Sequence, residues 1–250
     1  MADAIIYLHG TPGSPRELSL FGAPDNRFYA PDRFAIATRK TAELAIDALA
    51  DDLSTRFDGQ NLHLIGFSMG GFIAMQLAHR LGGRVSQIDL IASVAPFQGG
   101  GFMKQAAGAP LFRLAQLYPK LFKLAVAAQH FAARLAPARL ASLLFASARG
   151  GDRELAQNRE FMSAQAVILR DSFAHGRSGY ALEMIAVTDD WRHIVPQIKP
   201  PIRMWHGTLD NWTPFAMAEY LRATLPYVTE FKVIEGASHY STLRVALAEI

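Results

Sequence analysis

One serine, Ser68, stands between glycines where a strand-like segment meets a helix-like one. Residues 62–78 read LHLIGFSMGGFIAMQLA, an apolar run of strand length followed by apolar residues on one helical face. This pattern predicts a strand, a sharp turn and a helix. Gly66 and Gly70 would remove collisions with the neighbouring strand and helix, and the turn would expose the Ser68 hydroxyl beside a helix N-terminus. Ser68 is therefore a candidate nucleophile.

The same glycines are also compatible with a plain glycine-rich turn or a dinucleotide-binding turn. Asp89 follows at roughly the twenty-residue distance expected of a ribose-binding acid. The spacing GxxxGG does not match GxGxxG, however, and the segment is not near the start of a βαβ pair. We therefore favour the nucleophile interpretation.

The chain of 250 residues is long enough for one α/β domain, and its 19% charged residues are ordinary for a globular protein. It contains no cysteine, which excludes disulfides, thiolate metal sites and cysteine nucleophiles. The N-terminus lacks a basic region, and no window approaches the roughly 18 apolar residues of a membrane span. We expect a soluble, cytoplasmic protein without an integral membrane segment.

Strand and helix patterns alternate along most of the chain. The order indicates a parallel sheet with helices on both faces. Expected strands lie at 4–8, from 62 to the turn at Ser68, at 85–94, from 202, and at 231–234, with a further short candidate at 27–30. Expected helices lie at 41–56, after the turn at Ser68, after Pro214, and at about 242–250. Residues 1–96 and 191–250 would form this core.

Residues 97–190 have a different character. Alanine- and leucine-rich helical segments are interrupted by Pro110, Pro119 and Pro137, which predicts a helical cap inserted over the catalytic end of the sheet. Its aromatic residues are candidates for an acyl pocket, although such residues more often fill a core: Phe97, Phe102, Phe112, Tyr118 and Phe122.

The cap is also basic. No acidic residue occurs between Asp89 and Asp152, whereas seven basic ones do: Lys104, Arg113, Lys120, Lys123, Arg134, Arg139 and Arg149. Subtracting these seven charges from the net charge of +3 leaves −4 for the rest of the chain. The basic residues either keep a packed helical subdomain soluble or form a surface for an anionic membrane or an acidic or acyl-chain substrate.

Three chemically complementary residues follow the ends of three expected strands, in the order Ser68, Asp210, His239. Catalytic groups of parallel α/β sheets gather at that edge, and this order is typical of a triad built on a nucleophile elbow. A histidine can take and return the serine proton, and a buried carboxylate fixes the imidazole tautomer. The backbone N–H groups of Thr11 and Met69 are placed to stabilise an oxyanion.

The loop at 9–14 and the remaining titratable residues have structural interpretations. His9 and Gly10 begin a stiff loop, and we expect the His9 side chain to shape it. We assign Asp189, Asp190 and His193 to the return from the cap, and His206 and His63 to structural positions. No HExxH or comparable cluster indicates a metal.

Four segments in order resemble the α/β-hydrolase superfamily, in its capped branch with a His-Gly oxyanion loop. They are HGTPGS at 9–14, GFSMGG at 66–71, WHGTLDNWTP at 205–214 and EGASHYS at 235–241. The resemblance implies that Ser68, Asp210 and His239 are nucleophile, acid and base, and that Thr11 and Met69 donate to the oxyanion. The chain begins on the family's third strand, so the expected sheet is N-terminally shortened, and the cap matches no recognisable subfamily.

The resemblance implies a cofactor-independent serine hydrolase that acts on a small-molecule ester or thioester through an acyl-enzyme, with no nucleic-acid partner. A serine at the elbow argues against haloalkane dehalogenases and epoxide hydrolases, whose resemblance would require aspartate. C–C bond hydrolases, lactonases, perhydrolases, amidases and acyltransferases share the triad and stay open. A non-catalytic receptor or scaffold is the alternative of another class, because fold alone does not prove function.

Overall fold

The computed structural model describes residues 3–22, 27–37, 41–174 and 177–250. Its centre is a six-stranded sheet in the order β2-β1-β3-β4-β5-β6, and every neighbouring pair is parallel. The strands are β1 (Ala4–Leu8), β2 (Phe28–Tyr29), β3 (Leu62–Phe67), β4 (Val85–Ile91), β5 (Ile202–Gly207) and β6 (Val228–Ile234). The expected parallel α/β sheet is therefore confirmed. Met1 and Ala2, the start of the expected core segment, lie outside the described residues.

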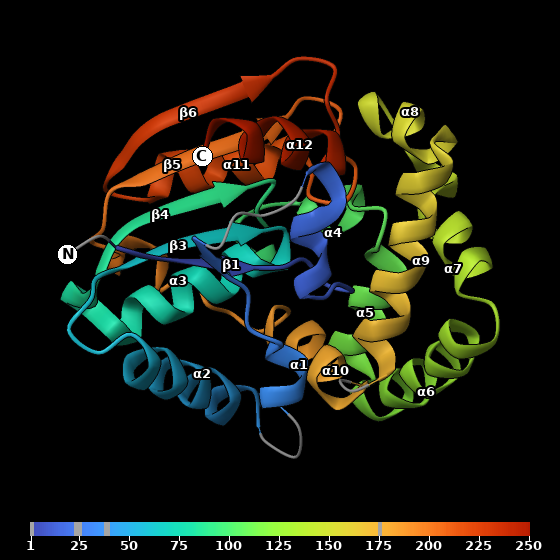
Figure 1. Ribbon diagram of the computed structural model, residues 1–250, viewed down its shortest axis with the longest axis horizontal. Coiled ribbons are helices and arrows are strands. Elements are labelled where there is room, and N and C mark those ends of the chain that lie inside the picture. Colours follow the sequence, from blue (N-terminus) through green and yellow to red (C-terminus); the bar gives the residue numbers. More distant parts are fainter. Residues whose placement is uncertain (1–2, 23–26, 38–40, 175–176) are drawn as a thin grey trace.

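Helices cover both faces of the sheet (Figure 1). In β3, Leu62 and Leu64 belong to the core shared with α2 and α3, whereas Ile65 and Phe67 pack with the last helix, α12. This division follows from the two-residue period of a strand. Residues 97–190, the segment expected to form a cap, are called the cap below. The helices outside this segment are α1 (Arg33–Ile36), α2 (Ala42–Arg56), α3 (Met69–Leu81), α11 (Phe215–Thr224) and α12 (His239–Glu249), with a 3₁₀ turn, η1 (Pro15–Phe21).

The described chain between β4 and β5 contains helices and no strand. These helices lie beyond the arrowheads of the sheet, at its carboxyl edge (Figure 1). The prolines predicted to interrupt these helices instead begin them. Pro110, Pro119 and Pro137 each occupy a first turn, where a missing N–H costs nothing. The helices are α4 (Phe102–Gln105), α5 (Ala109–Leu117), α6 (Pro119–Leu135), α7 (Pro137–Leu144), α8 (Gly151–Gln157), α9 (Arg159–Ala174) and α10 (Arg177–Ala186).

Three boundaries differ from the sequence prediction by about three residues. Strand β6 begins at Val228 rather than at residue 231. Strand β4 ends at Ile91 rather than at residue 94. Helix α12 begins at His239, not near residue 242, because Ser238 and Ser241 form a reciprocal capping box in which the Ser238 N–H donates to Ser241 Oγ at 2.7 Å. His239 therefore lies on the first turn of a helix instead of in a loop.

Candidate active site

Ser68 occupies a strained turn between β3 and α3. Its φ of 57° and ψ of −122° lie outside the regions that side-chain-bearing residues favour. A Cβ at Gly66 would lie 2.6 Å from the carbonyl oxygen of Gly70, and a Cβ at Gly70 would overlap the carbonyl oxygen of Leu8 in β1. Both glycines are therefore required by close backbone approach, as the sequence predicts.

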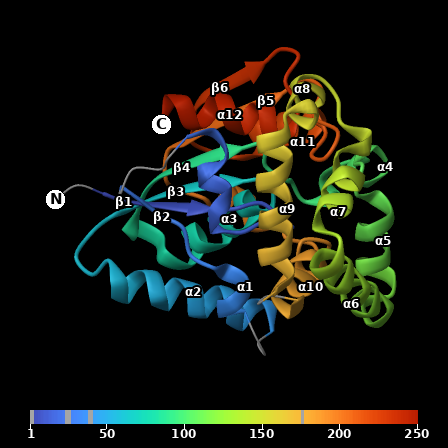
Figure 2. The same cartoon turned by 45° about the vertical axis from the view of Figure 1, so that its right-hand side comes forward.

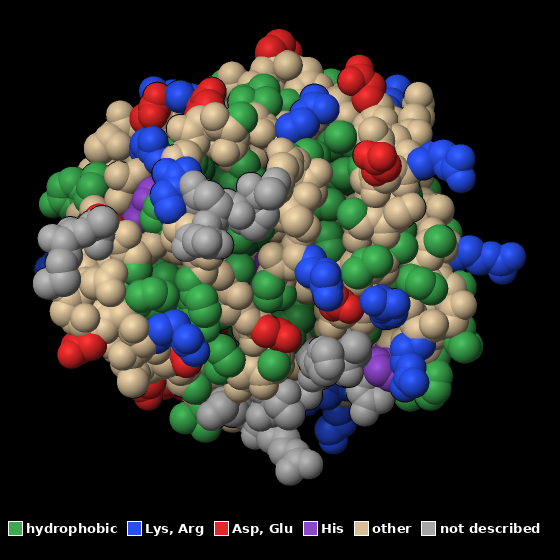
Figure 3. Space-filling view, viewed as in Figure 1, with side chains coloured by type: hydrophobic (Ala, Val, Ile, Leu, Met, Phe, Trp, Pro, Cys, Tyr) green, Lys and Arg blue, Asp and Glu red, His purple; other side chains and the backbone are tan. Residues whose placement is uncertain are grey.

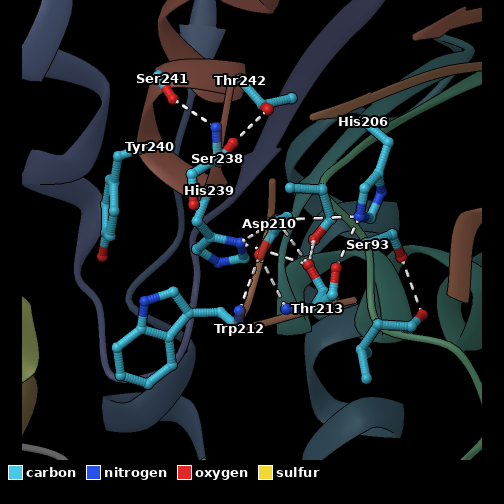
Figure 4. Close-up of polar contacts among 12 residues, drawn as sticks. Ser93, His206, Asp210, Trp212, Thr213, Ser238, His239, Tyr240, Ser241 and Thr242 are labelled. Carbon is cyan, nitrogen blue, oxygen red and sulfur yellow. Dashed lines mark hydrogen bonds and ion pairs between the residues drawn. The ribbon is translucent and has the colours of Figure 1, made fainter. Parts of the chain in front are cut away.

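Asp210 follows β5, and its carboxylate is held by the turn that it begins. The backbone N–H groups of Trp212 and Thr213 donate to Asp210 Oδ1 at 2.8 and 3.0 Å. The Thr213 hydroxyl lies 2.9 Å from Oδ2. Figure 4 shows the carboxylate at the centre of these contacts. The side chain has no exposed surface, so its orientation is fixed by the protein alone.

His239 is the partner of that carboxylate. Its Nδ1–H donates to Asp210 Oδ2 at 2.7 Å (Figure 4), and its ring centroid lies 4.7 Å from that of Phe67, the residue before Ser68. Residues 29 positions apart in the sequence thus form the acid–histidine pair that the strand order predicts.

Burial and charge have opposite effects on the pKa values of His239 and Asp210. Burial alone would lower the pKa of His239, but the charge and hydrogen bond of Asp210, with smaller contributions from Asp152 and Glu17, raise it above its ordinary value. Burial alone would raise the pKa of Asp210, yet the interaction with His239 holds it below its usual range. The carboxylate is therefore ionised and the imidazole is a stronger base than a free histidine.

Glu17, a fully buried residue of η1, holds the loop after β1 in place through hydrogen bonds. Glu17 Oε2 accepts hydrogen bonds from the Gly10 backbone N–H at 2.7 Å and from the Tyr7 hydroxyl at 2.9 Å. Burial raises the pKa of Glu17 to about 7, although both hydrogen bonds favour the ionised form. His9 Nδ1 lies 2.8 Å from the Gly10 carbonyl oxygen, which agrees with the expected loop-shaping position.

A buried ion pair anchors the same loop from the cap. Arg33 donates through Nε and Nη2 to the two carboxylate oxygens of Glu183 in α10, each at 3.0 Å, and through Nη1 to the His9 carbonyl oxygen at 2.8 Å. The Thr11 hydroxyl donates to Glu183 Oε2 at 2.8 Å. The loop that carries the expected oxyanion donor Thr11 is thus fixed from α1 and α10 together.

A second cap residue, Asp152, lies at the N-terminus of α12. Its carboxylate accepts from the backbone N–H groups of Tyr240 and Ser241, at 3.0 and 2.7 Å, and from the Ser241 hydroxyl at 2.7 Å. A negative group at a helix N-terminus satisfies donors that have no intrahelical acceptor. Asp152 therefore fixes the turn on which His239 lies.

Sequence reasoning missed Asp152, Glu17, Arg33 and Glu183. Asp152 had one sequence indication, as the first acid after the acid-free stretch. For the other three no local pattern indicates a burial or a partner, so only the folded chain reveals them.

Ser68, Thr11 and Met69 line one pocket beside the helices of residues 97–190. Its cavity volume is about 100 Å³, and no charged side chain lines it. Of the candidate aromatic residues, Phe97 and Phe112 line this pocket. The other three do not: Phe102 and Phe122 are buried in the core, and Tyr118 is exposed.

The remaining candidates lie elsewhere in the fold. His63 Nε2 lies 2.8 Å from Asp89 Oδ2, and Arg203 donates to the same carboxylate at 2.6 Å, so the acid of the dinucleotide alternative is a buried partner within the sheet. Asp190 pairs with Arg192 on the surface. His206 Nε2 donates to the Thr213 carbonyl oxygen at 2.7 Å, a structural position (Figure 4). Among the described residues, no group of three or more His, Cys, Asp or Glu side chains is placed to hold a metal ion.

Comparison with family profiles matches residues 5–249 to the family described as "Alpha/beta hydrolase family". The chain belongs to this family. A comparison with curated proteins found no match.

Solved structures of the same fold cover the whole chain at low identity. They include a thermophilic esterase from Thermogutta terrifontis, with 16% identity, 88% of its chain covered and a TM-score of 0.69. A bromoperoxidase from Bacillus anthracis has 17% identity, 91% coverage and a TM-score of 0.68. Est816, described as an N-acyl homoserine lactone degrading enzyme, has 17% identity, 93% coverage and a TM-score of 0.66. These likenesses establish the fold, and membership of the family supports a hydrolase.

Within the described part of the chain, no helix has both the length and the apolar character to span a membrane.

Proposed function

We propose that the protein is a serine hydrolase that cleaves a carboxylic ester or thioester through an acyl-enzyme. Ser68 is the nucleophile, His239 the general base and acid, and Asp210 the carboxylate that orients the imidazole. The observation that carries this proposal is the 2.7 Å hydrogen bond between His239 Nδ1 and Asp210 Oδ2, together with the strained backbone of Ser68, whose preceding residue Phe67 packs against the His239 ring. The bond leaves Nε2 as the basic nitrogen, which is the tautomer that a serine nucleophile needs.

The reaction proceeds in two halves. Ser68 Oγ attacks the acyl carbon while His239 Nε2 takes the hydroxyl proton; the bond to the leaving alcohol or thiol then breaks, and Nε2 returns the proton to it. Water next attacks the acyl-enzyme, losing a proton to Nε2, and the ester bond to Ser68 breaks with protonation of Oγ. The products are a carboxylic acid and an alcohol or thiol.

The backbone N–H groups of Thr11 and Met69 stabilise the negative charge on the former carbonyl oxygen in both halves. Met69 is the first residue of α3, so its N–H has no acceptor within the helix. The hydrogen bonds of Glu17 and Glu183 fix the loop that bears Thr11, so the donor is positioned before the substrate binds.

The lining of the pocket supports an uncharged, largely apolar acyl or alcohol group, because burying a charge there would leave it without a partner. We propose that residues 97–190 act as the cap that shields this group from water. Lactones are cyclic esters. Because the chain is similar in fold to Est816, we include lactones in the proposed substrate class. C–C bond hydrolysis and acyl transfer are distinguished by product analysis with water as the sole acceptor.

Labelling with a fluorophosphonate probe, with intact mass as readout, tests the nucleophile directly. One adduct is expected on the native protein and none on Ser68→Ala, while Ser93→Ala, which removes another buried serine, keeps the adduct. Ester turnover should fall by about 10⁴-fold or more in Ser68→Ala. An unlabelled but folded native protein would instead support a receptor or scaffold.

A further inference from the structure

Helix α6 carries apolar side chains on two opposite faces. The inner face is fully buried and consists of Phe122, Val126 and Ala133. The outer face is exposed to between 53% and 83% and consists of Leu121, Leu124, Phe131 and Leu135. Steps of three, seven and four residues place these four side chains along one side of the helix. Packing against the neighbouring helices explains the inner face, but the outer one has no partner among the residues that the structure describes.

The exposed apolar surface continues onto the neighbouring helix ends. We define the outer cap face as the seven exposed residues Leu117, Tyr118, Leu121, Leu124, Phe131, Leu135 and Leu143. They are seven of the eleven large hydrophobic residues that are exposed in the described chain. Scattered exposed hydrophobic residues need no explanation, but a contiguous group of this kind marks an interaction surface. Figure 2 places α5, α6 and α7 along one margin of the molecule, away from the sheet.

Basic side chains flank this apolar face, and acidic ones are absent from its helices. Lys120, Lys123 and Arg134 are exposed on α6, and their positions fall on the arc next to the leucines. Lys and Arg side chains project among hydrophobic ones at the right and lower right of Figure 3, where α6 and α7 lie. A symmetric contact with a second copy would bring these like charges together, whereas lipid phosphates neutralise them.

We propose that the outer cap face docks on an anionic lipid bilayer. The exposed leucines and Phe131 enter the interfacial region, and Lys120, Lys123 and Arg134 contact the headgroup phosphates, the arrangement of an amphipathic helix that lies in the membrane plane.

The same helices connect this surface to the pocket. Leu111 and Phe112 of α5, Gln129 of α6, and Leu140 and Leu144 of α7 line the pocket above Ser68. Docking would therefore hold the pocket wall against the lipid, which suits an ester with a long acyl chain drawn from the bilayer. This last step rests on the proposed hydrolase function; the docking surface does not.

Co-sedimentation of the full chain with vesicles tests the surface without any substrate. We expect partitioning onto vesicles of equal parts phosphatidylglycerol and phosphatidylcholine at low salt, with loss on pure phosphatidylcholine and at high salt. Lys120→Glu combined with Lys123→Glu should reduce the partition coefficient about thirtyfold or more, at roughly fivefold for each basic group lost. Leu124→Ser combined with Leu135→Ser should reduce it about tenfold or more.

Matched substitutions away from the cap serve as controls. Leu44→Ser removes another exposed leucine, on α2, and Lys199→Glu reverses another exposed lysine; both should bind as the native protein does. Equal circular dichroism spectra and unfolding midpoints show that all variants are folded.

The docking proposal is overturned by an absence of binding to anionic vesicles at low salt, or by controls that lose as much binding as the cap variants. A second result would also overturn it: the native chain does not bind vesicles but forms a dimer, and the double variant Leu124→Ser, Leu135→Ser dissociates that dimer. The outer cap face would then be an interface with a second copy. Fluorophosphonate labelling of Ser68 is read separately, so failure of one proposal does not imply failure of the other.

Discussion

Two buried carboxylates, Asp152 and Glu17, act on His239 in addition to its hydrogen-bonded partner Asp210. Both raise the pKa of the imidazole, together with the larger effect of Asp210, and burial opposes all three. His206, which is also buried, lies on the other side of Asp210, with Nε2 3.8 Å from Oδ2. The basicity of His239 is therefore set together by residues from the turn after β5, from η1 and from α8.

This environment predicts the pH dependence of the proposed reaction. His239 must be neutral to accept the Ser68 proton, so activity is present above the imidazole pKa and lost below it. We expect kcat/KM to fall with decreasing pH through an apparent pKa above the ordinary 6.5 of histidine. Asp152→Asn should move this apparent pKa downward, because it removes a negative charge that raises it.

Initial rates with a soluble ester across the neutral range measure the profile. Glu17→Gln is the companion variant, since Glu17 titrates near pH 7 and contributes to the same apparent pKa. A profile that is flat through this range in the native protein would contradict the assignment of His239 as base.

Asp210→Asn removes the charge of the triad carboxylate and retains its shape. The amide can donate to Nδ1, which stabilises the wrong imidazole tautomer, and kcat should fall by about 10⁴-fold with the fold intact. Asp189→Asn is the control, because Asp189 lies in an exposed turn before β5. Steady-state kinetics measure kcat for both variants. A greater loss of kcat in Asp189→Asn than in Asp210→Asn would show that the acid is misassigned.

At the scale of elements, helix α12 depends on the cap for its first turn. Asp152→Asn replaces an acceptor of three hydrogen bonds with an amide whose NH₂ faces donors, and it should lower the free energy of unfolding by about 1–3 kcal/mol. Glu154→Gln changes an exposed residue on the same helix α8 and should alter stability by less than about 0.5 kcal/mol. Urea titrations with unchanged m-values measure both, and similar losses in the two variants would argue against the anchoring role.

Local patterns predicted the elements that carry the proposed triad. The features that the sequence could not reveal depend on contacts between distant residues. The turn at Ser68 was predictable because Gly66 and Gly70 lie within two residues of it. The start of α12 was missed because the capping box of Ser238 and Ser241 uses a second serine where glutamate or glutamine is the usual indication.

The partners of the buried charges were beyond sequence reasoning for a different reason. Asp152 lies 88 residues from Tyr240, and Arg33 lies 150 residues from Glu183. A charged residue whose partner is not known is expected to be exposed. Their burial follows only from the placement of the cap on the core, which no periodicity in residues 97–190 specifies.

At the scale of the whole molecule, two ion pairs of the described residues join residues 97–190 to the rest of the chain, in contrasting surroundings. Arg33 and Glu183 have side chains exposed by only 2% and 10%, whereas Arg16, paired with Asp171 of α9, is exposed by 66%. Ion pairs contribute very differently when water can replace one partner and when it cannot. The two pairs also differ in geometry, because Arg33 donates to both carboxylate oxygens of Glu183 and Arg16 donates to one oxygen of Asp171.

Glu183→Gln should destabilise the protein far more than Asp171→Asn. The first leaves the Arg33 guanidinium buried without a counter-charge and should lower the free energy of unfolding by about 3–5 kcal/mol. The second leaves Arg16 solvated and should cost less than about 1 kcal/mol. Chemical denaturation measures both, and fluorophosphonate labelling of the folded Glu183→Gln protein should also slow, because glutamine keeps only one acceptor oxygen for the donors of Arg33 and Thr11. Equal losses of stability in the two variants would mean that the buried pair does not join cap and core, and that apolar packing alone holds them together.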